Sequence, residues 1–188
     1  MTTDLNAITA ELDALTDPAE IAARTASIRD TLRAKRETLL PMRDTAAVSL
    51  AVYDGVPEPE VRRVIGITTH NGWKKLGERV RKAHPVKTRK NAKPVTDKTA
   101  VRVAKYYGKP PVIVNARETL DDVVPEIAAI DMAIRALDAR HNAAMIAMVR
   151  AGAANHEVAK AADVSSSYVA QFISKHGLTR PVREPVPA

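Results

Sequence analysis

The sequence has no cysteine and few aromatic residues, with one Trp, one Phe and four Tyr among 188 residues. The lack of cysteine excludes disulfide bonds, thiolate metal sites and a cysteine nucleophile. Because aromatic residues are scarce, hydrophobic cores must be built mainly from Ala, Val, Ile, Leu and Met. That bias, together with only seven glycines, favours helices over sheets. We therefore expect an all-α fold.

The motifs of common catalytic and cofactor sites are also missing. The five histidines show no metal-ligand spacing, and there is neither a Gly-rich phosphate loop nor a G-x-S-x-G motif. Asp121-Asp122 are interpreted as the acidic start of a helix, and His141 as a core residue. Ser166 and Ser167 have no base in sequence reach that would activate them. We expect no enzyme activity, no cofactor and no metal site.

The N-terminal segment MTTDLNAITAELDAL is acidic and amphipathic. It has no basic n-region and no long apolar run, so we expect neither a signal peptide nor a membrane span. A soluble, cytoplasmic and nucleoid-associated protein is the resulting prediction.

Positive charge is concentrated in one part of the chain. Residues 79–117 hold 12 Lys and Arg against one acid, Asp97, whereas the rest of the chain holds 17 Lys and Arg against 21 Asp and Glu. The net charge of +7 is therefore the property of one segment. Such a concentration is typical of proteins that bind a polyanion.

Residues 155–177, NHEVAKAADVSSSYVAQFISKHG, predict two short helices joined by a tight turn. Asn155 is expected to cap the first helix and Ser165 the second, whose inward residues would be Val169 and Ile173. A small residue in the first helix, Ala159, suits a close and steep crossing. The stretch resembles the helix-turn-helix units of bacterial and phage DNA-binding proteins, in the form E-V-A-x-x-x-x-V-S-x-x-x-V. A helical hairpin inside a bundle is the alternative.

An internal repeat is indicated by a constant offset of 97 residues. Residues 43–80 lie over residues 140–177 without a gap and with seven identities in 38 positions. In this alignment Thr68 corresponds to the cap Ser165. Two positions depart from the pattern. Arg62 must turn outward or widen the helix crossing, and at Gly72 the missing anchor is expected to be replaced by a buried Trp73. The alternative is that the Trp73 ring is exposed and contacts DNA.

A long helix is predicted before each of these stretches, and a short one over Thr3–Leu15. Asp17-Pro18 starts the first long helix, which runs to about Tyr53 and should be kinked or split by Pro41. The second begins between residues 119 and 126 and runs to Arg150. Their apolar stripes suit pairing with another helix, within the chain or between chains. The stripes consist of Ile21, Ile28, Leu32, Leu39, Met42 and Ala46, and of Leu120, Ile127, Ile130, Ile134, Leu137, His141, Ala144 and Met148.

The expected architecture is all-α, with two tandem repeats that each comprise a long helix followed by a helix-turn-helix. The first repeat spans residues 1–83 and the second residues 119–178. Residues 84–118 form a basic, proline-containing linker or arm, with a short helix over KTAVRVAKYY. Residues 179–188 are expected to be a disordered tail.

This organisation predicts sequence-specific binding of double-stranded DNA at a bipartite site, as in a repressor or a plasmid or phage maintenance factor. The residues expected to reach base edges are Ser166, Ser167, Tyr168 and Gln171, and, in the first copy, Thr69, His70, Asn71 and Lys74. Those expected to contact phosphates are Lys75, Arg79, Arg81, Lys82, Lys87, Arg89, Lys90, Lys93, Arg102 and Lys175.

Two alternatives remain open at this point. In the first, the long helices form a coiled-coil homo-oligomer, as in a phage packaging or architectural protein, with weakly specific DNA binding. In the second, Tyr106-Tyr107 among basic residues bind a single strand or RNA.

Overall fold

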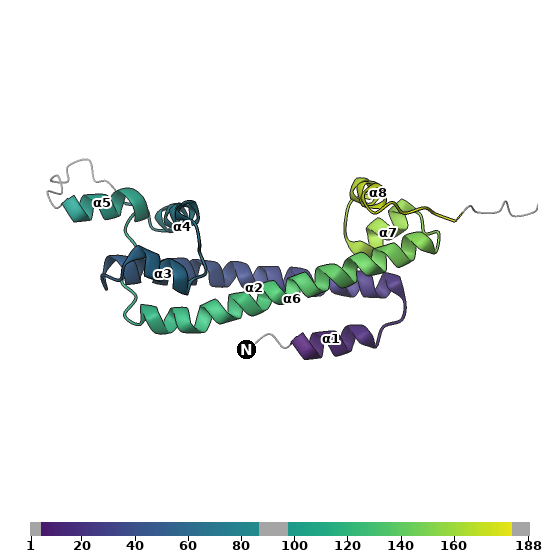
Figure 1. Ribbon diagram of the computed structural model, residues 1–188, viewed down its shortest axis with the longest axis horizontal. Coiled ribbons are helices and arrows are strands. Elements are labelled where there is room, and N and C mark those ends of the chain that lie inside the picture. The colour runs from purple at the N-terminus through teal and green to yellow at the C-terminus, as the bar shows by residue number, and fades with distance from the viewer. Residues whose placement is uncertain (1–4, 87–97, 182–188) are drawn as a thin grey trace, which may run out of the picture. The chain divides into compact units, whose positions relative to one another are not determined.

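The computed structural model describes residues 5–86 and 98–181, and every secondary-structure element in these ranges is an α-helix (Figure 1). The all-α prediction is confirmed for this part of the chain. Within these ranges, none of the helices combines the length and the apolar character that crossing a membrane requires. In chain order the helices are α1 (Leu5–Asp13), α2 (Pro18–Val52), α3 (Glu58–Val64), α4 (His70–Ala83), α5 (Lys98–Tyr107), α6 (Ala116–Arg150), α7 (Asn155–Ala162) and α8 (Ser166–Lys175).

The two long helices, α2 and α6, have 35 residues each. As predicted, Asp17 precedes α2, and its carboxylate accepts a hydrogen bond from the backbone N–H of Ala19 at 3.0 Å. The prediction that Pro41 splits the helix is wrong, because α2 continues through Pro41 as one helix. Proline removes a single backbone donor, and the loss of one hydrogen bond does not end a helix of 35 residues. The helix α6 begins at Ala116, three residues before the earliest predicted start, and contains Pro125.

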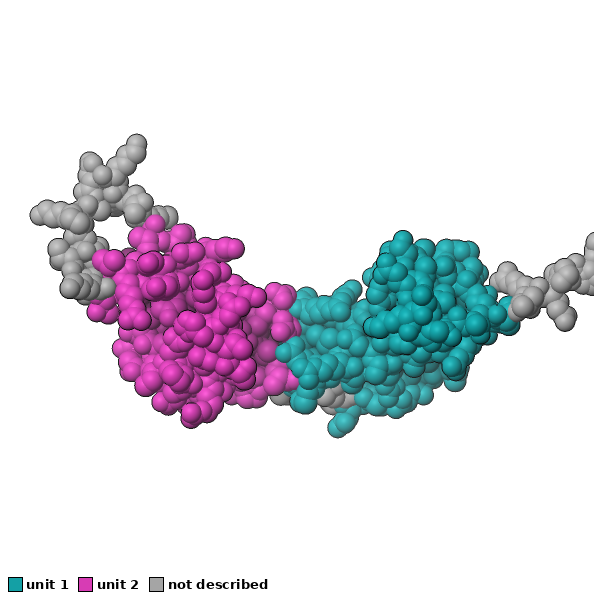
Figure 2. Space-filling model, turned by 45° about the horizontal axis from the view of Figure 1, so that its top comes forward, with its two compact units in different colours: residues 1–34, 129–188 teal, residues 35–128 magenta. Residues whose placement is uncertain are grey.

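The chain divides into two compact units, which Figure 2 colours separately. Unit 1 comprises residues 1–34 and 129–188, and unit 2 comprises residues 35–128. This division differs from the four consecutive segments expected from the sequence. The physical reason is that α2 and α6 each supply one segment to unit 1 and another to unit 2. Each unit therefore contains residues from both of the predicted repeats.

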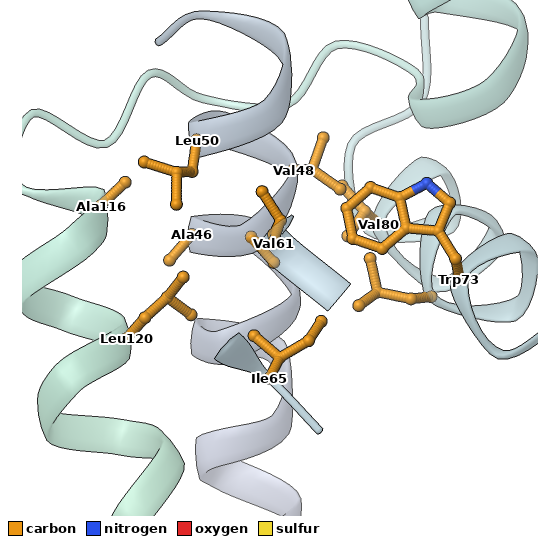
Figure 3. Packing of buried hydrophobic residues seen from close by; sticks show 11 residues of the cluster. Ala46, Val48, Leu50, Val61, Ile65, Trp73, Val80, Ala116 and Leu120 are labelled. Atoms are coloured by element: carbon orange, nitrogen blue, oxygen red, sulfur yellow. The ribbon is translucent and has the colours of Figure 1, made fainter. Parts of the chain in front are cut away.

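Unit 2 has a core of buried side chains from four helices (Figure 3). The end of α2 contributes Ala46, Ala47, Val48 and Leu50. Trp73 is 2% exposed, which confirms that this side chain is buried. The first turns of α6 close the core, and the ion pair between Lys35 and Glu126, at 2.5 Å, also joins α2 to α6. The remaining members of the cluster are Val61, Ile65, Leu76, Val80, Ala116 and Leu120.

Unit 1 has an analogous core in which the start of α2 contributes Ala22. Within this unit Arg29 of α2 pairs with Asp138 of α6 at 3.0 Å. Met42, placed on the apolar stripe of α2 by the sequence, belongs to unit 2 and is 52% exposed. The prediction that Met42 belongs to the buried stripe is therefore wrong: it lies one turn before the buried Ala46, but its side chain faces solvent. The other residues of the unit 1 core are Ala144, Met145, Met148, Val149, Val158, Ala159, Ala162, Val169 and Phe172.

Candidate nucleic-acid interface

In unit 1, α7 and α8 pack against each other across a three-residue turn (Figure 1). Asp163 adopts the left-handed conformation (φ 50°), which ends α7 and redirects the chain. As predicted, Ser165 caps α8, and its hydroxyl oxygen accepts a hydrogen bond from the backbone N–H of Tyr168 at 3.1 Å. Val164 is partly buried against the core. The turn therefore fixes the direction in which α8 leaves α7.

The start of α7 differs from the expectation. Its N-cap is Ala154, and Asn155 is the first helical residue. The carboxylate of Glu157 accepts a hydrogen bond from the Ala154 N–H at 2.6 Å, so a side chain of the first turn reaches back to the cap residue. The side-chain oxygen of Asn155 instead accepts a hydrogen bond from Arg180.

The inward face of α8 consists of Val169 and Phe172, which are 0% and 5% exposed. The prediction that Ile173 is the second anchor is therefore corrected, since Ile173 is only partly buried. Spacing alone did not separate the two, because i+3 and i+4 both return to one face of a helix. Tyr168 lies beside Phe172, with a ring-centroid distance of 6.3 Å.

The outward face of α8 is polar and carries the residues predicted to read bases. Ser166, Ser167, Tyr168, Gln171 and Lys175 are all exposed. Because Phe172 points inward, two further exposed residues share this face with Ser167 and Gln171 by helical spacing. They are Ala170 and Ser174, which the sequence interpretation omitted because it used the wrong anchor.

In unit 2, the turn between α3 and α4 spans residues 65–69 and is two residues longer than the turn between α7 and α8. The cap of its second helix lies one residue later than the alignment at offset 97 implies. The N-cap of α4 is Thr69, whose hydroxyl oxygen accepts a hydrogen bond from the Gly72 N–H at 3.0 Å. Thr68 is thus not the cap, as the alignment had suggested. Counted from the caps, Trp73 and Leu76 take the places that Val169 and Phe172 have in α8. The apparent loss of an anchor at Gly72 is therefore explained by this shift.

Gly72 and Arg62 both have specific roles in this turn. A Cβ atom at Gly72 would lie 2.8 Å from Cγ2 of Ile67, so a side chain there would push against the turn. Arg62 is partly buried, and its guanidinium donates hydrogen bonds to the carbonyls of Ile67 at 3.4 Å and Thr68 at 2.5 Å. Arg62 thus contacts the turn itself and does not simply extend into solvent, as one of the two expectations had it.

Two of the predicted base-reading residues at the start of α4 form hydrogen bonds or close polar contacts within unit 2, and a third lines a cavity. Thr69 is the cap, His70 Nδ1 lies 3.1 Å from a Glu58 carboxylate oxygen, and Lys74 lines a cavity beside α5. Asn71 is exposed. Lys75, predicted to contact phosphate, lies one turn after Asn71 and is also exposed, so both share the outward face.

Two of the residues on α4 that were predicted to contact phosphates form hydrogen bonds or ion pairs within unit 2. Arg79 Nε and Nη2 each lie 2.7 Å from Oδ2 of the buried Asp44. Arg81 donates a hydrogen bond to the Lys105 carbonyl at 3.2 Å. The side chains of Lys75 and Lys82 are exposed and form no ion pair with any residue in the described ranges.

The helix α5 packs against α4 (Figure 1). The short helix predicted within the linker is therefore part of unit 2. Burial raises the pKa of Tyr107 above its ordinary value, although the hydrogen bond from Trp73 opposes this effect. Arg102 is exposed on α5. Lys87, Arg89, Lys90 and Lys93, also predicted to contact phosphate, lie outside the described residues.

The two units differ strongly in charge. Residues 35–128 of unit 2 hold 19 Lys and Arg against 11 Asp and Glu, whereas the two segments of unit 1 hold 10 against 11. The excess of +8 in unit 2, against −1 in unit 1, accounts for the whole net charge. Long-range attraction of a polyanion would therefore act on unit 2, while α8 offers a polar and nearly neutral surface.

Among the described residues, no group of three or more His, Asp or Glu side chains is placed to hold a metal ion. Comparisons of the chain with protein-family models, with curated proteins and with solved structures found no match.

Proposed function

We propose that the chain is a sequence-specific double-stranded DNA-binding protein with two tandem, non-identical helix-turn-helix units. One helix-turn-helix consists of α7, the turn and α8 in unit 1, and the other of α3, the turn and α4 in unit 2. Each would place its second helix in a major groove, and the two would read unlike half-sites. A repressor or a plasmid or phage maintenance factor is the biological role that suits such a protein.

The observation that carries the proposal is the surface of α8. This helix is anchored by Val169 and Phe172 and capped by Ser165, so its backbone is rigidly presented. Its opposite side shows only small or hydrogen-bonding groups. Small side chains permit close approach to base edges, and Gln171 has the amide geometry that pairs bidentately with adenine.

A second line of support is the difference in net charge between the two units. Unit 2 has the excess positive charge, with the side chains of Lys75 and Lys82 free of ion pairs within the described ranges. Contacts to phosphates supply affinity and orientation without reading sequence. We therefore assign most of the salt-dependent affinity to unit 2, and to unit 1 a smaller electrostatic share.

Selection of bound sequences from a random duplex pool tests the proposal. The expected result is a motif with two unlike halves. Gln171→Ala should remove a base preference from one half of the motif and weaken binding by about 1–3 kcal/mol, as expected for a single bidentate contact. Asn71→Ala should remove a base preference from the other half. If no sequence is enriched, specific recognition is refuted.

Variants that remove a phosphate contact serve as the matched comparison. Lys175→Ala and Lys82→Ala should leave the selected motif unchanged. Each should reduce the slope of log affinity against log salt concentration by about 1. If these variants altered the motif while Gln171→Ala did not, the assignment of base and phosphate contacts would be wrong.

The alternative function is an oligomeric assembly protein with weakly specific DNA binding. The observation that favours it is the exposure of Met132 on α6 and Met42 on α2, at 57% and 52%, since exposed apolar groups on long helices can pack against another chain. Measurement of the mass in solution, with and without DNA, separates the two functions. A stable ring-sized oligomer that binds DNA without sequence preference would replace the first proposal by the second.

A further inference from the structure

A cavity of about 360 Å³ lies between α4 and α5 in unit 2. Trp73, Gly77 and Tyr107 line its apolar side. Trp73 Nε1 donates a hydrogen bond to the Tyr107 hydroxyl at 3.0 Å, and the two rings meet edge to face with centroids 6.3 Å apart. A Cβ atom at Gly77 would lie 3.0 Å from the Tyr107 ring. The absence of a side chain at Gly77 therefore allows α5 to approach α4 and form this cavity.

The remaining lining of the cavity is rich in cations and has one exposed aromatic ring. Lys74 and Arg81 come from α4, and Arg102 and Lys105 from α5. Tyr106 is 48% exposed, and the Lys105 ammonium lies 5.6 Å from its ring centroid. A flat π-system beside several cations is the combination that binds an aromatic ring carrying a negative charge.

Two carboxylates also line the cavity, and they differ in their partners. Glu58 lies 3.7 Å from Arg62 and 3.1 Å from His70. Glu78 forms no hydrogen bond or ion pair with any residue in the described ranges. A free carboxylate repels a simple anion but accepts hydrogen bonds from the N–H groups of a nucleobase. The lining thus offers a stacking ring, phosphate-binding cations and an acceptor for a base edge.

We propose that this cavity binds a single nucleotide, with its base on Tyr106, its phosphate at Arg102 and Lys105, and base N–H groups at Glu78. Its volume is within the range of small-molecule sites. This function goes beyond duplex recognition, because a paired and stacked base cannot enter the cavity. The nucleotide is either a free nucleoside monophosphate or an unpaired nucleotide of a strand.

Trp73 gives a direct readout, because it is the only Trp in the chain and lines the cavity. The full chain is titrated with each nucleoside monophosphate, and separately with a single-stranded oligonucleotide, while Trp73 fluorescence is recorded. A saturable change is expected from at least one of the two, and inorganic phosphate at the same concentration should give none.

Matched variants locate the response. Tyr106→Ala and Arg102→Gln should each weaken binding about tenfold, which corresponds to the loss of one stacking or charged contact. Tyr106→Phe keeps the ring and should retain binding. Lys109→Ala should bind as the unchanged chain does, because Lys109 is an exposed cation of the same unit that does not line the cavity.

A response to free nucleotides identifies the free monophosphate as the ligand, and a response to the oligonucleotide alone identifies the unpaired nucleotide. Either supports the proposal if Tyr106→Ala weakens it. No response to either probe, or a response that Tyr106→Ala leaves unchanged, overturns it. The titrations contain no duplex, so their failure and the failure of duplex selection are separate results.

Discussion

The contact between Asp44 and Arg79 leads to a quantitative prediction about what holds α4 in place. Asp44 is 2% exposed and accepts hydrogen bonds from two guanidinium groups. Arg43 donates hydrogen bonds to Oδ1 of Asp44 from its Nε at 3.0 Å and from its Nη2 at 2.7 Å. Arg79 of α4 donates from its Nε to Oδ2 of Asp44 at 2.7 Å. Asp44→Asn replaces one acceptor by a donor that faces a guanidinium.

The magnitude follows from burial. Breaking a buried ion pair by removing one partner costs about 3–5 kcal/mol. Since the Arg79 side chain is 51% exposed and can be hydrated, we expect the lower end, about 3 kcal/mol, for Asp44→Asn. Arg79→Ala leaves Asp44 paired with Arg43, so its cost should be near that of an exposed pair, about 1 kcal/mol.

A double-mutant cycle by urea unfolding measures the coupling. In the Asp44→Asn background, Arg79→Ala should lower the free energy of unfolding by almost nothing. The loss in the double variant should therefore be smaller than the sum of the two single losses by about 1 kcal/mol. Additive losses would refute the argument that this pair holds α4. In duplex binding, Arg79→Ala should leave the salt slope unchanged, whereas Lys75→Ala should reduce it by about 1.

Three further predictions concern stability measured by urea unfolding. Burial first, and then the positive charge of Arg29, lower the pKa of His141 below its ordinary value. Because the unfolded chain then binds the proton more tightly, stability should be full above about pH 6.5 and fall as the pH drops below that value, and His141→Leu should flatten this dependence. Gly72→Ala should lower stability by about 1 kcal/mol, despite alanine's higher helix propensity, because its Cβ would meet the turn before α4; a gain would refute the tight packing. Phe172→Ala should lower the free energy of unfolding by about 3 kcal/mol, and Ile173→Ala should lower it clearly less. If the order were reversed, Ile173 would be the anchor of α8.

The buried state of His141 illustrates a limit of prediction from sequence. Its place on the apolar stripe indicated a core residue, and it is 2% exposed. No pattern in the sequence indicated that both ring nitrogens lack a hydrogen-bond partner among the described residues. Hydrogen-bond satisfaction depends on groups brought close by packing, so periodicity predicts burial but not its electrostatic consequence.

Local signals in the sequence determined the helices and most of their ends. Asp17 and Ser165 act as helix-start residues, and the periodic apolar positions of α6 are largely buried, because caps and amphipathic faces depend on residues within a turn or two. Tertiary structure alone decided the longer turn that makes Thr69 the cap of α4, and the packing of α5 on α4 through Trp73 and Tyr107, which are 34 residues apart. It also decided the division of α2 and α6 between two units. These features depend on contacts between distant segments, whose energies no local pattern contains.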